Sequence, residues 1–372
     1  MKEKFIPVNV PLLNGKEKEY VLEALESSWI SSEGPFVSKF ERNFSKYVDR
    51  DFGIAVSSGS AALDIAVKAL DIGIGDEVIM PTFTIISCAA SVVKRGAIPI
   101  FVDVDPLTWN MDVSQIQGKI TSKTKAIMVV HIYGLPVDMD PLIKLANKYK
   151  LLVLEDAAEM HGQTYKNRLC GSFGDISTFS FYANKNITTG EGGMIVTNNK
   201  SLRDRCRSLR NLCFQDKKRF LHSELGWNYR LTNIQAAIGL AQLERIELIV
   251  EKKKKIGALY NDLLKNLKGI SLPMSNTDYA NNIYWIYGIL INKKNLNADE
   301  LINILKSKGI GARPFFYPLH LQPVLNEYKK YNASKFPISE KISKQGLYLP
   351  SGLGISYAQI KKVANVLGDI FG

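Results

Sequence analysis

The sequence predicts an α/β fold in which a large, mostly parallel sheet domain is followed by a smaller α+β C-terminal domain. Short apolar runs rich in β-branched residues alternate with helical patterns, which is the rhythm of a parallel sheet. The composition agrees, because 46% hydrophobic and 23% charged residues in 372 are typical of a globular chain and exclude wholesale disorder. The runs are GIAV at 53–56, EVIMP at 77–81, IPIFVDV at 98–104, KAIMVVHIYG at 125–134 and LLVLED at 151–156.

Two further runs, ISTFSF at 176–181 and GGMIVTN at 192–198, follow more closely on each other. The loop between them is too short for a crossover helix, so we expect the two strands to be antiparallel. From residue 233 apolar residues recur at helical spacing, which predicts one or two long helices that lead out of the large domain. We therefore expect a large domain, with the N-terminal segment, over 1–249 and a small domain over 250–372.

The small domain is expected to contain strands near 283–291 and 310–316, and helices at 298–308 and 357–371. The chain carries 48 basic and 36 acidic side chains, a formal charge of +12, which favours an anionic partner. The Lys252–Lys255 run on a helix predicts a solvated face, because no aromatic residues interleave with it. A non-catalytic nucleic-acid-binding or regulatory protein remains the remote alternative.

No apolar run approaches the roughly 20 residues of a membrane span, so we expect no membrane insertion. The N-terminal stretch MKEKFIPVNVP lacks the apolar core of a secretory signal, which predicts a cytoplasmic protein. The four cysteines are scattered without a C-x-x-C pair, and we expect neither a disulfide framework nor a metal site.

The segment Ser57–Leu63 predicts an anion site. It follows a predicted strand and opens a helix, where unpaired backbone N–H groups and the helix dipole favour a phosphate. The plainer interpretation is an ordinary helix start that Ser58 or Ser60 caps.

Asp156 and Lys185 are the other candidates. Asp156 ends an apolar strand, where open α/β sheets bind ligands, and a buried carboxylate there requires a cationic or protonated partner. Alternatively, it caps a helix or pairs with an arginine. Lys185 lies on the connection between two apolar strands, where a desolvated amine can form a Schiff base. A solvated loop lysine is the alternative.

Together these three features match the needs of pyridoxal 5′-phosphate (PLP): a phosphate cradle, an acid for the ring nitrogen and a lysine amine. A nicotinamide dehydrogenase is disfavoured, because no G-x-G-x-x-G follows the first strand. A Walker A sequence is absent as well.

The stretch from Ile6 to Gln322 resembles the sugar aminotransferases of the DegT/DnrJ/EryC1/StrS family, which are fold type I PLP enzymes acting on nucleotide-linked keto sugars. The motifs that carry the resemblance include SSGSAALDIA at 57–66, GDEVIMPTFT at 75–84, LEDAAEMHG at 154–162, GSFGDISTFSFYANKNITTGEGG at 171–193, GWNYRLTN at 226–233 and RPFFYPLH at 313–320. The resemblance implies a fold type I PLP-dependent aminotransferase. Relatives with dehydratase-like activity have a histidine in place of the Schiff-base lysine, so Lys185 argues against that activity.

The resemblance also implies roles for individual residues. Lys185 would be the Schiff-base lysine and proton shuttle, Asp156 would hold the ring-nitrogen proton, and Glu159 would contact the ring hydroxyl. The phosphate would be bound by Ser180, by the backbone at Gly59, Ser60 and Ala61, and by Asn228 of a neighbouring subunit, which implies a homodimer with shared active sites. Ile85 stands where many members place an aromatic residue against the cofactor ring.

For the substrate, the motifs are most similar to those of members that aminate C4 of GDP-4-keto-6-deoxy-D-mannose with L-glutamate. UDP- or dTDP-4-keto-6-deoxyglucose remains the alternative acceptor, and the segment 210–223 departs from the motifs of those members. The residues implied to border the substrate are Trp29, Ser31, Arg230, Arg313, Tyr317 and His320. Trp29 could equally be a core aromatic, and His320 a satisfied histidine of the small domain.

Overall fold

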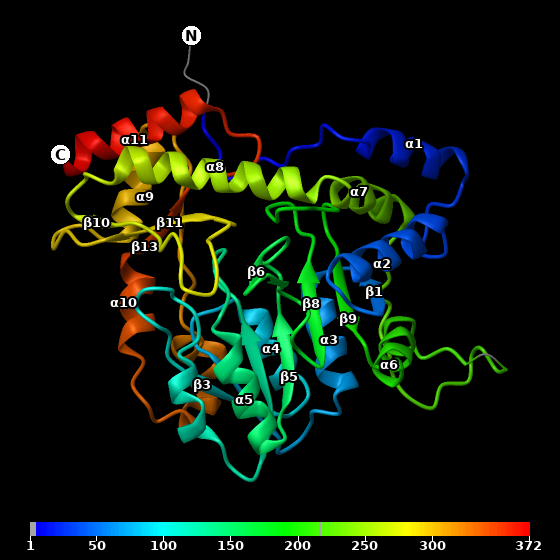
Figure 1. Cartoon of the computed structure of the whole chain (residues 1–372). Coiled ribbons are helices and arrows are strands. Elements are labelled where there is room, and N and C mark those ends of the chain that lie inside the picture. The colour runs from blue at the N-terminus through cyan, green and yellow to red at the C-terminus, as the bar shows by residue number, and fades with distance from the viewer. Residues whose placement is uncertain (1–4, 216) are drawn as a thin grey trace.

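A seven-stranded sheet lies at the centre of the computed structural model, which describes residues 5–215 and 217–372 (Figure 1). Its strand order is β1-β9-β8-β5-β4-β2-β3, and β9 runs against the other six. The predicted antiparallel pairing of the 176–181 and 192–198 runs is confirmed as β8 and β9. The strands are β1 (Phe52–Val56), β2 (Glu77–Pro81), β3 (Ile98–Val102), β4 (Thr124–Val130), β5 (Leu152–Asp156), β8 (Ile176–Ser180) and β9 (Gly193–Thr197).

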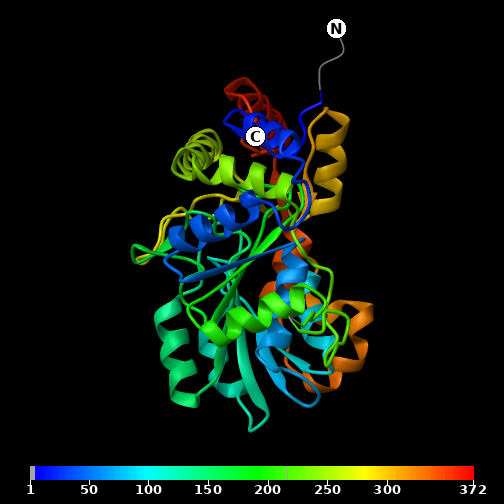
Figure 2. The ribbon, with the colours of Figure 1, turned by 90° about the vertical axis from the view of Figure 1, so that its right-hand side faces the viewer.

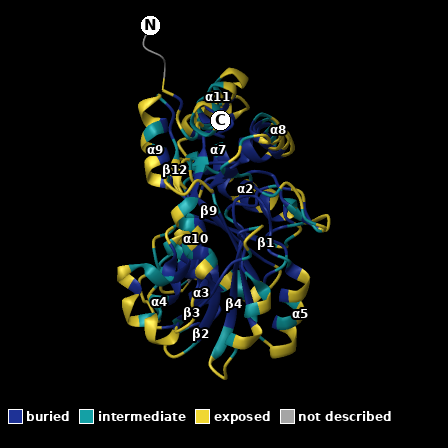
Figure 3. Cartoon of the chain, turned by 90° about the vertical axis from the view of Figure 1, so that its left-hand side faces the viewer, coloured by how far each residue is buried: buried dark blue, intermediate teal, exposed yellow. Residues whose placement is uncertain are grey.

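Helices cover both faces of this sheet (Figure 2). Successive side chains of a strand point to opposite faces, so Ile54 and Val56 join one core while Ala55 joins the other. Figure 3 shows the buried sheet between helices whose outer faces are exposed. One face is covered by α3 (Gly59–Ala69), α4 (Ile86–Val93) and α6 (Lys200–Arg210), the other by α2 (Pro35–Tyr47), α5 (Met139–Tyr149) and α7 (Asn233–Leu243).

A four-stranded antiparallel sheet forms the second unit, in the order β10-β11-β13-β12. Its strands are β10 (Ile270–Ser271), β11 (Tyr287–Ile291), β12 (Arg313–Pro314) and β13 (Gly346–Leu349), and its helices include α9 (Ala298–Ser307) and α11 (Tyr357–Phe371). The helix α10 (Pro337–Gln345) leads into β13, but its Ile342 packs into a core of the large sheet. The remaining elements are α1 (Glu17–Glu26), the hairpin of β6 (Thr164–Tyr165) and β7 (Arg168–Leu169), and the short 3-10 helices η1 (Val113–Gln115), η2 (Gln117–Lys119), η3 (Leu319–Leu321) and η4 (Pro323–Tyr331).

The helix α8 (Ile246–Leu264) runs across the top of both units in Figure 1. Ile249 and Val250 pack into a core of the large sheet, whereas Ile256 and Tyr260 pack into the core of the small one. The division expected between residues 249 and 250 therefore falls inside an unbroken helix and stays a prediction. Ile6, expected with the large domain, packs into the small core.

Lys253 departs from the expected solvated face of the 252–255 run. Its side chain is buried, and Nζ donates to the carbonyl of Ser351 at 2.6 Å. Lys255 pairs with Glu251 at 2.5 Å. Because Lys253 is internal and the charge of Lys255 is paired with Glu251, the run does not form a continuous cationic patch.

The expectations for the N-terminal stretch and for the 210–223 segment both include residues outside the described ranges. The first four residues of the N-terminal stretch lie there, as does residue 216 of the 210–223 segment. Among the described helices, none is long and apolar enough to cross a membrane.

Glu155, a fully buried carboxylate on β5, fixes the turn that leads into β8. It accepts hydrogen bonds from the backbone N–H groups of Gly171 (2.5 Å), Phe173 (2.9 Å) and Gly174 (3.0 Å). His131 Nε2 and Ser177 Oγ add contacts at 3.1 and 3.0 Å. Burial alone would raise the pKa of Glu155, but hydrogen bonds from His131 and the turn lower it to about 2. The turn is therefore built around a carboxylate that stays ionised.

We expect Glu155→Gln to destabilise the fold at neutral pH and to remove part of its acid sensitivity. The pKa of Glu155 falls from 4.5 to about 2 on folding, so its contribution is complete above pH 4.5 and disappears as the pH falls towards 2. In the wild type this group should account for a loss of about 3 kcal/mol in the free energy of unfolding over that window. Urea unfolding at a series of pH values measures it, with exposed Glu19→Gln as the control. An identical acid profile in Glu155→Gln would contradict the assignment.

Candidate active site

A cavity of about 400 Å³ lies at the carboxyl ends of β5 and β8. Its walls come from the first turn of α3, the segment after β5 and the loop that carries Lys185, and from residues later in the chain that include Trp285, Phe316 and Tyr348. We call it the site cavity. Its size is typical of a small-molecule site.

The first turn of α3 forms one wall of the site cavity. Ser58, not Ser60, is the N-cap, because its Oγ accepts the N–H of Ala61 at 3.1 Å. Gly59 and Ser60 line the cavity, and in the described part of the chain their N–H groups have no acceptor. The same turn is therefore both a capped helix start and a candidate anion site.

Asp156 lies at the end of β5 and is buried. Its Oδ1 accepts the N–H of Ala158 at 3.1 Å, and its Oδ2 accepts the thiol of Cys88 at 3.4 Å. Burial raises the pKa of this carboxyl, because few donors replace the lost water. No arginine among the described residues pairs with it. The Asp156 carboxylate therefore faces the cavity without a hydrogen bond from a positively charged N–H group, and a protonated ring nitrogen could supply one.

Lys185 is not a solvated loop lysine, since only 11% of its side chain is exposed. Its Nζ lies 3.9 Å from Glu159 Oε1 and 3.9 Å from the centre of the Trp285 ring. Burial lowers the pKa of Lys185, while Glu159 and Asp156 act in the opposite direction. A lowered pKa favours the neutral amine, the nucleophilic form that adds to a carbonyl.

Glu159 lies between the backbone of Tyr133 and Lys185. Its Oε2 accepts the N–H of Tyr133 at 2.7 Å, which fixes the carboxyl group. Burial raises the pKa of Glu159, and the Lys185 amine partly offsets this effect. The site cavity thus contains two buried carboxyl groups and one buried amine, and burial shifts the pKa of each towards its neutral form.

The remaining predicted residues of the cofactor site divide between the cavity and its surroundings. Ser180 and Ile85 line the site cavity. Ala61 is buried behind it, with its N–H used in the cap.

Three predicted substrate residues lie on the segment that runs from β12 into η3. Arg313 is exposed on the wall of a neighbouring groove, and Tyr317 is 55% exposed. His320 points elsewhere: Nδ1 lies 2.7 Å from Thr82 Oγ1 and Nε2 3.4 Å from Glu340, with the ring packed on Phe336. This is the geometry of the satisfied histidine that the sequence left open.

Besides Ala61, Arg313, Tyr317 and His320, four further predicted residues are not part of the site cavity's lining, as the described residues define it: Trp29, Ser31, Asn228 and Arg230. The backbone oxygens of Trp29 and Ser31 accept the side-chain amide and the backbone N–H of Asn233. Trp29 is 54% exposed, so it is not a core aromatic. Asn228 is exposed and accepts Arg230 Nε at 2.9 Å.

Sequence reasoning missed several residues that line the cavity or contact its carboxyl groups. Tyr133 carried a sequence signal, because it follows an apolar strand and precedes a glycine. The structure shows a positive φ of 58° there. Cys88, Thr178 and Trp285 carried none, since their roles come from neighbours far away in the chain.

Comparison with known proteins decides the family. The family model of the DegT/DnrJ/EryC1/StrS aminotransferases matches residues 11–368. The chain belongs to this family. It is 45% identical to a GDP-perosamine synthase of Escherichia coli O157:H7 over 368 residues, 99% of each chain, and 41% identical to one of Caulobacter vibrioides over 98% of each.

Solved structures agree with the family. An aminotransferase from Psychrobacter cryohalolentis superposes with a TM-score of 0.90 at 30% identity, over 99% of this chain and 98% of that one. The predicted fold class is thereby confirmed. Members of the family depend on PLP, and this chain is a PLP-dependent sugar aminotransferase.

The residues of the site cavity fit PLP. Gly59 leaves space that a side chain would fill, since an added Cβ would lie 2.8 Å from Ser180 Cβ. Asp156 lacks a cationic partner, and Thr178 Oγ1 is buried without a hydrogen bond among the described residues. Gly59, Ser60 and Ser180 would hold the phosphate, Asp156 the ring nitrogen and Lys185 the aldehyde carbon. When bound, PLP supplies the electron sink for the transfer.

We expect Gly59→Ala to weaken PLP binding by roughly tenfold or more, because the new methyl group would push Ser180 out of the phosphate cradle. Fluorescence titration of the apoprotein with PLP measures the dissociation constant. Gly118→Ala is the matched control, since an added Cβ there meets nothing within 4 Å. Unchanged PLP affinity in Gly59→Ala would place the phosphate elsewhere.

Proposed function

We propose that this protein transfers the amino group of L-glutamate to C4 of GDP-4-keto-6-deoxy-D-mannose and so forms GDP-perosamine for polysaccharide synthesis. The observation that carries the proposal is the buried Lys185 amine, held beside Asp156 and Glu159 in the site cavity. The choice of a GDP-linked sugar rests on the two GDP-perosamine synthases, which align with nearly the whole chain.

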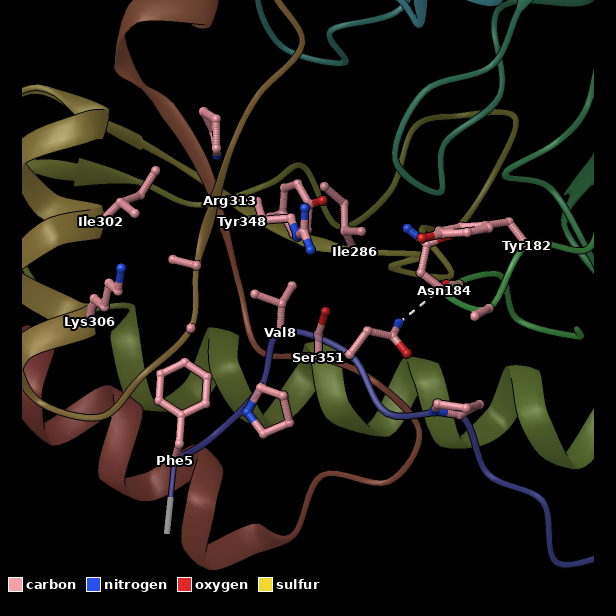
Figure 4. A pocket seen from close by; sticks show the side chains of 17 residues that line it. Phe5, Val8, Tyr182, Asn184, Ile286, Ile302, Lys306, Arg313, Tyr348 and Ser351 are labelled. Carbon is pink, nitrogen blue, oxygen red and sulfur yellow. Dashed lines mark hydrogen bonds between the residues drawn. The ribbon is translucent and has the colours of Figure 1, made fainter. Parts of the chain in front are cut away.

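A groove beside the site cavity supports a nucleotide-linked substrate. It encloses about 640 Å³ and shares Tyr182, Asn184, Pro314 and Tyr348 with the site cavity (Figure 4). Lys306 and Arg313 lie on its wall, no carboxylate side chain lines it, and neither cation has an ion-pair partner in residues 5–215 and 217–372. Two free cations suit a diphosphate, and Phe5, Tyr182 and Tyr348 offer aromatic surface for a base.

A homodimer would give a function to four predicted residues that lie outside the site cavity: Trp29, Ser31, Asn228 and Arg230. Asn228 and Arg230 lie on the segment whose backbone pairs with Val56, just before the turn that opens α3. Nearby in sequence, Phe220 and Leu225 are 81% and 83% exposed, and Ile30 beside Trp29 is 50% exposed. Exposed apolar side chains of this size favour a partner surface. We place Asn228, Arg230, Trp29 and Ser31 at the site of a second copy, reached across a two-fold axis.

We propose a cytoplasmic location. Its support is the cysteine chemistry, because Cys88, Cys170, Cys206 and Cys213 are all buried free thiols, as a reducing compartment maintains them.

We expect the purified protein, loaded with PLP and L-glutamate, to aminate GDP-4-keto-6-deoxymannose in competition with UDP- and dTDP-4-keto-6-deoxyglucose. Mass spectrometry of the products measures the preference. Lys185→Ala is the control and should lose both turnover and the visible absorption band of the bound cofactor. Amination of only the UDP or dTDP sugar would overturn the assignment of a GDP-linked substrate, but the aminotransfer chemistry assigned to Lys185 would stand. Turnover by Lys185→Ala would overturn the site itself.

We expect a heterodimer of one Lys185→Ala and one Asn228→Asp subunit, purified through two different tags, to show about half of the wild-type turnover. If Asn228 serves the neighbouring subunit, both substitutions fall in one site and the other site stays intact. Each substituted homodimer should be nearly inactive: Lys185→Ala lacks the amine, and the new carboxylate of Asn228→Asp would repel the phosphate. A heterodimer as inactive as the homodimers would show that each subunit uses its own Asn228.

A further inference from the structure

The carbonyl oxygen of Asn184 accepts hydrogen bonds from two side chains. Asn9 Nδ2 donates at 3.2 Å, drawn as the dashed line in Figure 4, and Trp285 Nε1 donates at 3.1 Å. A carbonyl oxygen has two lone pairs, so both are used. This carbonyl belongs to the peptide bond whose nitrogen is that of Lys185, and its orientation therefore fixes the backbone from which the lysine side chain starts.

The two donors come from parts of the chain that are remote from the loop. Asn9 is 175 residues before Asn184, and Trp285 is 101 residues after it. Asn9 lies on a segment that is hydrogen-bonded to Ser351 and Gly354, and Trp285 lies just before β11. The loop itself adds two contacts from the large domain: Lys185 N–H to the Tyr182 carbonyl at 2.9 Å, and Asn186 Nδ2 to the His161 carbonyl at 3.3 Å.

Asn9 cannot swing freely, because the N-terminal strap, residues 5–12, is pinned on both sides of it. The carbonyls of Val8 and Val10 accept the N–H groups of Ser351 and Gly354 at 3.1 and 3.0 Å. Further along, Gln242 Nε2 of α7 donates to the Leu12 carbonyl at 3.0 Å. The strap thus connects the small domain, the Lys185 loop and the large domain.

Trp285 contacts both ends of the lysine. Its N–H holds the peptide before Lys185, while its ring lies 3.9 Å from the amine. The ring is buried and stacks on Tyr133 with centroids 6.2 Å apart, so it has little freedom to turn. A lysine side chain has many rotamers, and fixing its base and its tip leaves few of them.

We propose that Asn9 and Trp285 are positioning residues that clamp the Asn184 carbonyl and thereby aim the Lys185 amine into the site cavity. The proposal rests on the role of Lys185 in the proposed function. It makes the strap and the small domain part of the catalytic geometry, although neither carries a group that reacts. An amine displaced by a fraction of an ångström reacts more slowly even when the substrate binds as before.

The test compares Asn9→Ala and Trp285→Phe with the wild type in the PLP-loaded enzyme. Asn9→Ala removes one donor, and Trp285→Phe removes the other while keeping an aromatic face. We expect about a tenfold loss of kcat for each, with the KM for the nucleotide sugar within about twofold. The midpoint of the pH titration of the visible cofactor band should shift as well, because the environment of the amine changes.

Two controls separate positioning from folding. Asn9→Gln keeps an amide donor and should recover part of kcat and of the band midpoint. Asn14→Ala lies beyond the strap and removes a contact with Arg245 (2.6 Å) that does not reach the loop, so both readouts should stay at wild-type values. The double variant should lose less than the product of the single losses, because the two bonds share one acceptor.

Three outcomes would overturn the proposal. A lower melting temperature with unchanged kcat and band midpoint would make the clamp merely structural. A raised KM with unchanged kcat in Asn9→Ala would make Asn9 a substrate contact, since it also lines the groove. If the loss of kcat in the double variant equals the product of the two single losses, the two hydrogen bonds act independently and do not form one clamp. Failure of the proposed function is distinguishable, because it would show without any change to Asn9 or Trp285: the wild type would not aminate the GDP sugar, or Lys185→Ala would keep its turnover.

Discussion

The arrangement of the site depends on a single buried carboxylate, Glu155. Five donors converge on it, and four of them belong to residues 171–177, so the turn before β8 closes around an ionised group. That turn sets the register in which Asp156 on β5 pairs with Thr178 on β8. The carboxyl ends of both strands therefore meet at one edge, and the loop after β8 brings Lys185 back over Asp156.

Charge balance explains why such a site is suited to a cofactor. Asp156, Glu159 and Lys185 are buried together, which costs solvation energy that the few hydrogen bonds around Asp156 do not replace. A ligand that brings a protonated ring nitrogen to Asp156 and an anionic phosphate to the open N–H groups of α3 would supply the missing partners. The protein is thus prepared for its cofactor at the expense of its own stability.

The second domain completes the site rather than only covering it. Trp285, Phe316 and Tyr348 close the site cavity, and Arg313 with Lys306 makes the adjoining groove cationic. The strap and the segment before β11 reach the loop of Lys185 through the Asn184 carbonyl. Since α8 runs unbroken through both cores, the two sheets hold these contacts in a fixed relation.

The sequence by itself determined the order of the strands along the chain, the antiparallel β8–β9 pair and three chemical groups of the site. These follow from local signals: periodicity marks a strand, small residues mark a helix start, and Asp156 and Lys185 stand at the ends of apolar runs. Only the tertiary structure decided that Ser58 is the cap, that Lys253 is internal, and that His320 faces Thr82 and Glu340. It also brought Cys88 to Asp156, and Asn9 and Trp285 to the loop of Lys185. Such contacts join residues as many as 238 positions apart, and their partners are set by packing that no local pattern encodes.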